Sequence, residues 1–287
     1  MKRGHRYEIF HTNAFLWLAS RRTESIHAVV TDPPYGVVEY TASQLEKQRA
    51  GTGGIWRLPP CYDGRKRRPM PRFTVLKDKD LKEIAEFHRQ LALLLLRVLV
   101  PGGHVILASQ ALVSHIVVGA FISAGFEIRA TIARIVKTLR GGDRPKGAHD
   151  KFPEVSVVPR GSWEPWLVFR KPCQGRVQDN LQKWHTGGLR RPSDVAPFRD
   201  LIDVAPARGK ERQLAQHPSL KPQALMRYLV RAVLPLGRGV VLDPFMGGGS
   251  TIAAAEHLGV ASIGLEVDDL YFEMAKGAIP ELAKLDV

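Results

Sequence analysis

Residues 240–259, VVLDPFMGGGSTIAAAEHLG, join an apolar strand to an alanine-rich helix through three consecutive glycines. The strand is predicted to end at Asp243, and Ser250 and Thr251 are expected to cap the helix. Glycines at such a turn let the backbone approach a bound molecule, and the helix amino terminus offers free N–H groups. The stretch therefore predicts an α/β fold with a binding site at the carboxyl end of this strand.

An acidic residue ends the next predicted strand, where Glu266 follows IGL at 263–265. In nucleotide-binding folds an acid at this place accepts hydrogen bonds from ribose hydroxyls. The glycines lack the spacing of the dinucleotide motif, and no lysine follows them as in a phosphate loop. A nucleoside with a zwitterionic tail fits the stretch better than a pyrophosphate. For the glycines alone, simple turn chemistry is the alternative.

Strands and helices alternate along most of the chain. Strands are predicted at 7–11, 26–31, 104–109, 127–139, 163–171, 239–244 and 261–267, and helices at 14–20, 80–99, 111–126, 222–235, 250–259 and from Leu270. The PGG at 101–103 is predicted to end the second helix before a strand begins. This order predicts a doubly wound, mainly parallel Rossmann-like sheet with helices on both faces.

Two basic stretches interrupt this alternation: Val37 to Val75, read as a long basic loop, and Gln174 to Gln216, read as an inserted segment. The chain carries 42 Lys and Arg against 28 Asp and Glu, a formal charge of +14. Such a balance favours a polyanionic partner, with a solvated basic surface as the alternative. The apolar run at 91–100 is too short to span a bilayer, so nucleic acid is favoured over lipid and no membrane partner is expected.

The two cysteines, Cys61 and Cys173, fit neither a disulfide framework nor a metal motif. No signal-peptide pattern is evident, so we expect a cytoplasmic protein of the prokaryotic cytosol or nucleoid. No metal site is predicted, because HExxH and paired CxxC motifs are absent and the ten histidines are scattered.

TDPPYG at 31–36 is an unusual end to a β-branched strand. Prolines fix φ and carry no N–H, so Pro33 and Pro34 hold an extended backbone whose carbonyls can accept hydrogen bonds. Asp32 adds a second acceptor, and Tyr35 presents a flat ring. Together they predict a pocket that grips an amino group by two acceptors while the ring stacks on the attached base. A plain turn is the alternative when only Asp32 and Pro33 are considered.

Four motifs, in this order, resemble those of the S-adenosylmethionine-dependent DNA amino-methyltransferases, which modify adenine N6 or cytosine N4. They are DPPY at 32–35, which matches the catalytic motif; VPGGHVILAS at 100–109, similar to the fifth strand; HPSLKP at 217–222, which resembles the segment before the cofactor loop; and DPFMGGGST at 243–251, which looks like that loop. The catalytic string precedes the cofactor loop, which resembles the permuted β arrangement of the family. The resemblance implies a methyltransferase sheet formed by 1–173 and 217–287, with 174–216 as the target-recognition segment.

The resemblance also implies roles for individual residues. The catalytic residues would be Asp32, Pro33, Pro34 and Tyr35, and S-adenosyl-L-methionine would contact Asn13, Asp32, Lys221, Pro222, Asp243, Phe245, Gly247, Gly249, Ser250, Thr251, Glu266 and Val267. Glu266 would hold the ribose, and Lys221 would lie near the methionine end. Asn13 departs from the family, which commonly has Asp facing the cofactor's adenine; Asn keeps an acceptor oxygen but loses the charge.

The resemblance implies methyl transfer to double-stranded DNA, with the target base flipped out of the duplex. Adenine N6 is favoured because the motif begins with Asp rather than the Ser common in cytosine N4 enzymes. The alternatives are an N4-cytosine enzyme, an RNA amino-methyltransferase and a non-catalytic DNA-binding regulator. Phosphate contacts are assigned to Arg65, Lys66, Arg67, Arg68, Arg190 and Arg191, and we expect a homodimer and a cognate restriction endonuclease as partners.

Overall fold

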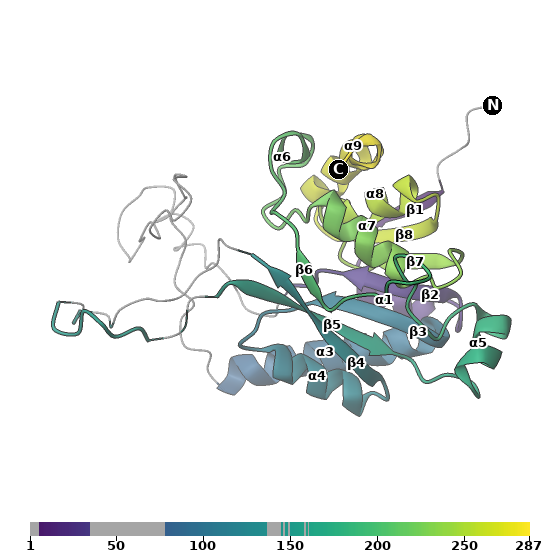
Figure 1. Cartoon of the computed structure of the whole chain (residues 1–287), viewed down its shortest axis with the longest axis horizontal. Coiled ribbons are helices and arrows are strands. Elements are labelled where there is room, and N and C mark those ends of the chain that lie inside the picture. Colours follow the sequence, from purple (N-terminus) through teal and green to yellow (C-terminus); the bar gives the residue numbers. More distant parts are fainter. Residues whose placement is uncertain are drawn as a thin grey trace.

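The computed structural model describes residues 6–34, 78–136, 145, 147–148, 150–157, 159 and 161–287 (Figure 1). Within these residues, eight strands form one sheet in the order β1-β8-β7-β2-β3-β5-β4-β6. The strands are β1 (Tyr7–His11), β2 (Ile26–Thr31), β3 (Leu99–Ala108), β4 (Glu127–Ile135), β5 (Trp163–Arg170), β6 (Leu201–Asp203), β7 (Val240–Asp243) and β8 (Ala261–Glu266). β5 runs antiparallel to β3 and β4, and the other pairings are parallel, which confirms the predicted mainly parallel sheet.

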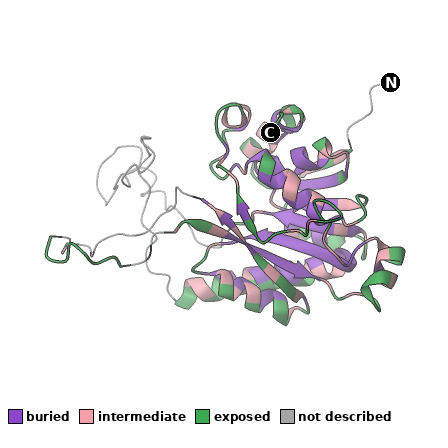
Figure 2. Cartoon of the chain, viewed as in Figure 1, coloured by how far each residue is buried: buried purple, intermediate pink, exposed green. Residues whose placement is uncertain are grey.

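Helices cover both faces of the sheet, so the molecule has three layers (Figures 1 and 2). One face packs against α1 (Ala14–Ser20), α3 (Asp78–Val98) and α4 (Ser114–Ser123), and the other against α7 (Gln223–Ala232), α8 (Ser250–His257) and α9 (Asp269–Lys284). Neighbouring strand residues alternate between the two cores: Val29 and Val105 pack on the α3 side, Val30 and Ile106 on the α7 side. The doubly wound prediction is confirmed. None of the described helices is long and apolar enough to cross a membrane.

The PGG at 101–103 lies inside β3, so the prediction that β3 begins only after it was wrong. β2 pairs with β3 at Ile26↔Leu99 and next at Ala28↔His104, so β3 accommodates extra residues as a bulge. Glycine suits this bulge because φ of Gly102 is +75° and a Cβ on Gly103 would lie 2.9 Å from the His27 carbonyl oxygen. A turn-like sequence here bends a strand instead of ending it.

The segment 174–216 contacts the sheet through two short elements. Helix α5 (Val177–Trp184) packs beside β3, and β6 pairs in parallel with β4, from Ala133↔Leu201 onward. A further short helix, α6 (Lys210–Leu214), precedes the segment that leads into α7. The segment therefore extends the sheet at its β4 edge.

Asn180 anchors α5, because its side chain is fully buried and bonded on both ends. Its Nδ2 donates to the carbonyl oxygens of Pro101 at 2.9 Å and Thr186 at 2.8 Å, and its Oδ1 accepts from the backbone N–H of Gln174 at 2.9 Å. One amide thus connects the bulge of β3 to both ends of α5.

Replacing Asn180 with Ala is expected to destabilise the protein by about 2–3 kcal/mol, because buried backbone groups lose their partners. Urea unfolding measures the loss. The exposed Gln182 on the same helix provides the control, and Gln182→Ala should change stability by no more than about 0.5 kcal/mol. Equal effects of the two substitutions would contradict the anchoring role of Asn180.

Candidate active site

Acidic and amide side chains follow four neighbouring parallel strands at the same edge of the sheet. Asp243 and Glu266 are the last residues of β7 and β8, Asp32 directly follows β2, and Asn13 lies two residues beyond β1. The registers His11↔Glu266 and Asp243↔Gly264 align these strand ends. The carboxyl edge predicted from the sequence therefore brings the four residues together.

The glycine turn is fixed by backbone conformation and by packing. Gly247 has φ +49° and Gly249 has φ +82°. A Cβ on Gly247 would lie 2.8 Å from the His217 ring, and a Cβ on Gly249 would collide with the Ile279 side chain. The backbone of the turn therefore packs closely against His217 and Ile279. A residue with a Cβ atom does not fit at Gly247 or Gly249.

The expected capping of α8 by Ser250 and Thr251 was wrong. Gly249 is the N-cap, with no side-chain hydrogen bond to the helix, and Ser250 is the first helical residue. Thr251 hydrogen-bonds to the Asp243 carboxyl group instead. Because the N-cap residue makes no side-chain hydrogen bond, the helix amino terminus keeps its backbone N–H groups available.

The Glu266 carboxylate is held by three backbone N–H groups. Oε2 accepts from Gly247 at 2.9 Å, and Oε1 accepts from Val267 and Asp268 at 2.9 Å each. A carboxylate has about four lone-pair positions, so about one remains to accept a hydrogen bond from a ligand's hydroxyl group. Its orientation beside the glycine turn fits the predicted ribose contact.

Asn13 and Val267 border the Glu266 carboxylate. The Asn13 side-chain oxygen accepts from the backbone N–H of Phe15 at 2.9 Å and so caps α1, while Val267 is 65% exposed. Thr12 donates its N–H to the Glu266 carbonyl oxygen at 2.8 Å, which joins the two strand ends. Asn13 Oδ1, the oxygen that the sequence assigned to the cofactor, is thus already used to cap α1. Its contact with the adenine of the cofactor stays a prediction.

Asp243 joins the glycine turn to the end of β2. Its buried Oδ1 accepts from the Thr31 hydroxyl at 2.7 Å and from the Phe245 N–H at 3.1 Å. Burial raises the pKa of Asp243 to about 6, and the nearby Asp32 charge acts in the same direction. The Phe245 ring packs 6.0 Å from the Phe87 ring of α3, centroid to centroid.

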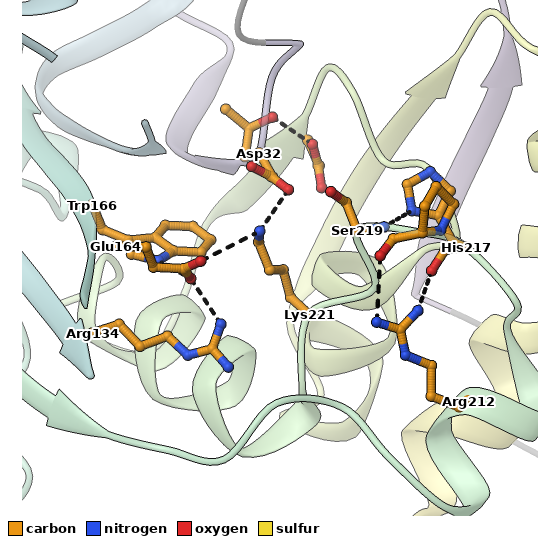
Figure 3. A network of polar contacts seen from close by, with 11 residues as sticks. Asp32, Arg134, Glu164, Trp166, Arg212, His217, Ser219 and Lys221 are labelled. Carbon is orange, nitrogen blue, oxygen red and sulfur yellow. Dashed lines mark hydrogen bonds and ion pairs between the residues drawn. The ribbon is translucent and has the colours of Figure 1, made fainter. Parts of the chain in front are cut away.

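Asp32 forms a buried ion pair with Lys221 (Figure 3). Lys221 Nζ lies 2.8 Å from Asp32 Oδ2, and the two side chains are only 11% and 16% exposed. Burial lowers the pKa of Lys221, but the carboxylates of Asp32 and Glu164 outweigh this and raise it above its usual value. Pro33 is buried beside Asp32, and Pro34 is exposed.

Lys221 is positioned by the segment 217–222. Arg212 donates to the carbonyl oxygens of His217 and Pro218, and the Ser219 N–H donates to His217 Nδ1 at 3.2 Å. The His217 ring fills the space above Gly247 that a Cβ would occupy. This segment therefore sits directly against the glycine turn.

Pro222 is the N-cap residue of α7, and the residue after it ties this helix to α8. Gln223 Nε2 donates to the Ser250 carbonyl oxygen at 3.0 Å. The HPSLKP and DPFMGGGST motifs, predicted separately from the sequence, thus form one packed unit.

Sequence reasoning missed the charged pair that completes this cluster. Arg134 Nη1 on β4 lies 2.8 Å from Glu164 Oε1 on β5, and the indole N–H of Trp166 donates to the same oxygen at 2.9 Å. Lys221 and Arg134 hold the pKa of Glu164 below its usual value despite burial, which alone would raise it. The sequence did offer a signal for this pair: Arg134 and Glu164 each lie within a predicted apolar strand. Buried charges are normally paired, so the two could have been expected to meet.

Of the predicted DNA-binding residues, the structure describes only Arg190 and Arg191, and it does not bring them to the carboxyl edge of the sheet. The Arg190 N–H donates to the Ala232 carbonyl oxygen at the end of α7, and the Arg191 carbonyl oxygen accepts from Arg231 at 2.7 Å. A Cβ on Gly237, just before β7, would touch the Arg190 guanidinium, so this arginine lies near the amino edge of the sheet. The remaining candidates lie outside the described residues, namely Tyr35, Arg65, Lys66, Arg67, Arg68 and the basic loop 37–75.

No cluster of three or more His, Cys, Asp or Glu side chains suited to a metal ion occurs in the part of the chain that the structure describes.

Asp243→Asn is expected to make folding stability less dependent on pH. Because the pKa of Asp243 is raised from 3.8 to about 6, its protonated form stabilises the folded state fully below pH 3.8, and this stabilisation is lost as pH rises through about 6. Asn keeps an acceptor for Thr31 and Phe245 but does not ionise. The thermal midpoint of the variant, relative to the unsubstituted protein, should be more favourable at about pH 7.5 than at about pH 4.5. An equal difference at both pH values would contradict the raised pKa.

Comparisons with known proteins agree with these features. A family model described as DNA methylase, N6_N4_Mtase, matches residues 26–277. The Type II methyltransferase M.HindIII of Haemophilus influenzae is 24% identical over 298 residues, 93% of this chain and 93% of that protein. The Type II methyltransferase M2.DpnII of Streptococcus pneumoniae is 23% identical over 272 residues, 93% of this chain and 87% of that protein.

Similar solved structures share the fold. The PvuII cytosine-N4-specific DNA methyltransferase has a TM-score of 0.61 and 14% identity, covering 98% of this chain and 87% of that chain. TTHA0409 from Thermus thermophilus, complexed with S-adenosyl-L-methionine, has a TM-score of 0.60 and 21% identity, covering 98% and 95%. The M1.HpyAVI-SAM complex has a TM-score of 0.58 and 19% identity, covering 97% and 100%. These likenesses confirm the predicted Rossmann-like methyltransferase fold.

The family match spans both the strand that leads into Asp32 and the glycine turn after Asp243, the two features that the site geometry joins. It confirms the resemblance drawn from the four motifs: the chain belongs to the DNA methylase family of N6 and N4 amino-methyltransferases.

Proposed function

We propose that this protein transfers a methyl group from S-adenosyl-L-methionine to the exocyclic N6 of adenine in duplex DNA, after the base has left the helix. The observation that carries this proposal is the Asp32 carboxylate at the end of β2, next to the strand end that bears the glycine turn. Asp rather than Ser at this position favours adenine.

The residues at the carboxyl edge fit S-adenosyl-L-methionine in chemistry. Glu266 offers its remaining lone-pair position to a ribose hydroxyl, and Val267 offers an exposed apolar surface to adenine. Lys221 lies in the segment whose His217 ring packs on the glycine turn, and it is assigned to the methionine end of the cofactor; the turn lets the backbone approach closely. When bound, the cofactor supplies a methyl group activated on a sulfonium centre.

Asp32 and Pro33 make the amine of the base nucleophilic. An exocyclic amino nitrogen is a poor nucleophile because its lone pair is delocalised into the ring. Acceptance of its two N–H groups by the Asp32 carboxylate and the Pro33 carbonyl oxygen concentrates the lone pair on nitrogen. Fixed acceptors and alignment supply the rate without a covalent enzyme intermediate. Tyr35 is assigned to stacking on the base.

Cytosine N4 is the second candidate substrate, because PvuII methyltransferase, described as cytosine-N4-specific, has a similar fold. The amino group of cytosine presents the same two N–H donors. The acceptor pair therefore fits either base, and the preference for adenine rests on Asp32.

We also infer the partners of the enzyme from this function. Double-stranded DNA is the substrate, and the net charge of +14 favours its binding. Residues 174–216 are assigned to target recognition. A homodimer, a cognate restriction endonuclease and a cytoplasmic location in a prokaryotic cell are further parts of the proposal.

Incubation with labelled S-adenosyl-L-methionine and duplex DNA, followed by digestion to nucleosides, is expected to yield labelled N6-methyladenine. Parallel reactions with RNA test the other nucleic acid. Label found only in N4-methylcytosine, or only in RNA, would contradict the proposed substrate.

Asp32→Ala is expected to lower methyl transfer by at least about a hundredfold, because one of the two acceptors for the base amine is lost. Cofactor affinity, measured by calorimetry, should fall far less than the rate of transfer. Asp179→Ala is the control, since Asp179 is paired with Arg176 on α5, away from the carboxyl edge. Full activity of Asp32→Ala would rule out the proposed role of the carboxylate.

A further inference from the structure

Lys221 lies between two carboxylates, and only one of them belongs to the catalytic motif. Its Nζ is 2.8 Å from Asp32 Oδ2 and 3.9 Å from Glu164 Oε2 (Figure 3). The side chain is 11% exposed, so water is a poor substitute for either partner. The two carboxylates therefore compete for one buried ammonium group.

Glu164 is held in a fixed orientation toward Lys221. Arg134 and Trp166 both donate to its Oε1, which leaves Oε2 as the oxygen nearest to Lys221. Arg134 and Glu164 are directly paired residues of β4 and β5, so the backbone of the hairpin holds this arrangement. Glu164 therefore presents one oxygen to the ammonium group at a constant position.

Asp32 faces conflicting demands in the proposed reaction. It must accept an N–H from the base amine, but the Lys221 ammonium at 2.8 Å draws on the same carboxylate. A movement of Nζ by about 1 Å toward Glu164 would replace the 3.9 Å contact with a charge-assisted hydrogen bond. Glu164 thus offers the Lys221 ammonium group a second carboxylate partner after only a small movement away from Asp32.

We propose that Glu164 is a positioning residue that takes Lys221 from Asp32 when the base amine enters, and so frees Asp32 to accept its N–H. This inference rests on the proposed function. Asp32, Glu164, Lys221 and Arg134 carry two charges of each sign. Without the Glu164 charge, Lys221 would keep Asp32 as its carboxylate partner and remain bound to it.

Glu164→Gln tests this role, because Gln keeps an acceptor for Arg134 and Trp166 but removes the charge that attracts Lys221. The rate constant of methyl transfer to DNA in a single turnover, at saturating cofactor and DNA, should fall at least about tenfold. Cofactor affinity measured by calorimetry should change by less than about twofold. This separation between transfer rate and binding is not expected for a general loss of structure.

Glu127→Gln is the matched control. Glu127 on β4 pairs with Arg170 on β5 at 2.6 Å, and the two are directly opposite in the same hairpin, at its other end. This substitution removes one carboxylate from an equivalent Glu–Arg pair without touching Lys221. Both variants should lose thermal stability, but only Glu164→Gln should slow transfer. Equal transfer rates in the two variants would overturn the inference.

A second substitution tests whether slow transfer in Glu164→Gln arises because Lys221 remains bound to Asp32. Adding Lys221→Gln to Glu164→Gln removes the ammonium from Asp32, so transfer at cofactor saturation should become faster than with Glu164→Gln alone. No increase would overturn the inference. The unsubstituted protein is assayed in parallel: if it methylates adenine and Glu164→Gln is equally fast, only the inference fails. If the unsubstituted protein transfers no label to DNA, the proposed function itself fails.

Discussion

The buried hydrogen bond from Thr31 to Asp243 joins the two halves of the site. These residues are 212 positions apart in the chain, yet the bond is 2.7 Å long because β2 and β7 are adjacent parallel strands. Asp32 follows one of them, and the glycine turn follows the other. The position of Asp32, the proposed acceptor for a base amine, relative to the glycine turn therefore depends on this contact rather than on the order of the motifs in the sequence.

The charged cluster beside this contact contributes more to orientation than to stability. Asp32, Lys221, Glu164 and Arg134 are mostly shielded from water, and buried ion pairs rarely repay their desolvation fully. Their geometry is nevertheless well determined, since two paired strands and the segment 217–222 each contribute part of the cluster. The two positive and two negative charges of this cluster cancel, so the site contains charged groups but little net charge.

Much of the site could be predicted from local sequence. Glycines, prolines and the acids at strand ends mark backbone conformations that few other residues adopt, so Asp32, Asp243 and Glu266 were placed correctly at one edge. Glu164 and Arg134 were missed because their partnership depends on the pairing of β4 with β5, which no local pattern reveals. The capping prediction for Ser250 and Thr251 failed because Gly249 starts the helix and Asp243 binds Thr251. The PGG of β3 was misread because a bulge and a turn use the same residues.

Because β5 runs antiparallel to its neighbours, the site is built from two kinds of strand end. Substitutions in one part therefore need not alter the other. The proposed cofactor side is formed by the final residues of β1, β8 and β7, which are followed by helices packed into the core. Glu164 instead comes from the first residues of β5, because this strand runs antiparallel to β3 and β4. Substitutions at the start of β5 therefore alter the charged cluster beside Asp32, while the glycine turn depends on contacts with Glu266 and with the segment 217–222. In evolutionary terms, the charged cluster can diverge by substitution in β4 and β5 while the glycine turn stays the same.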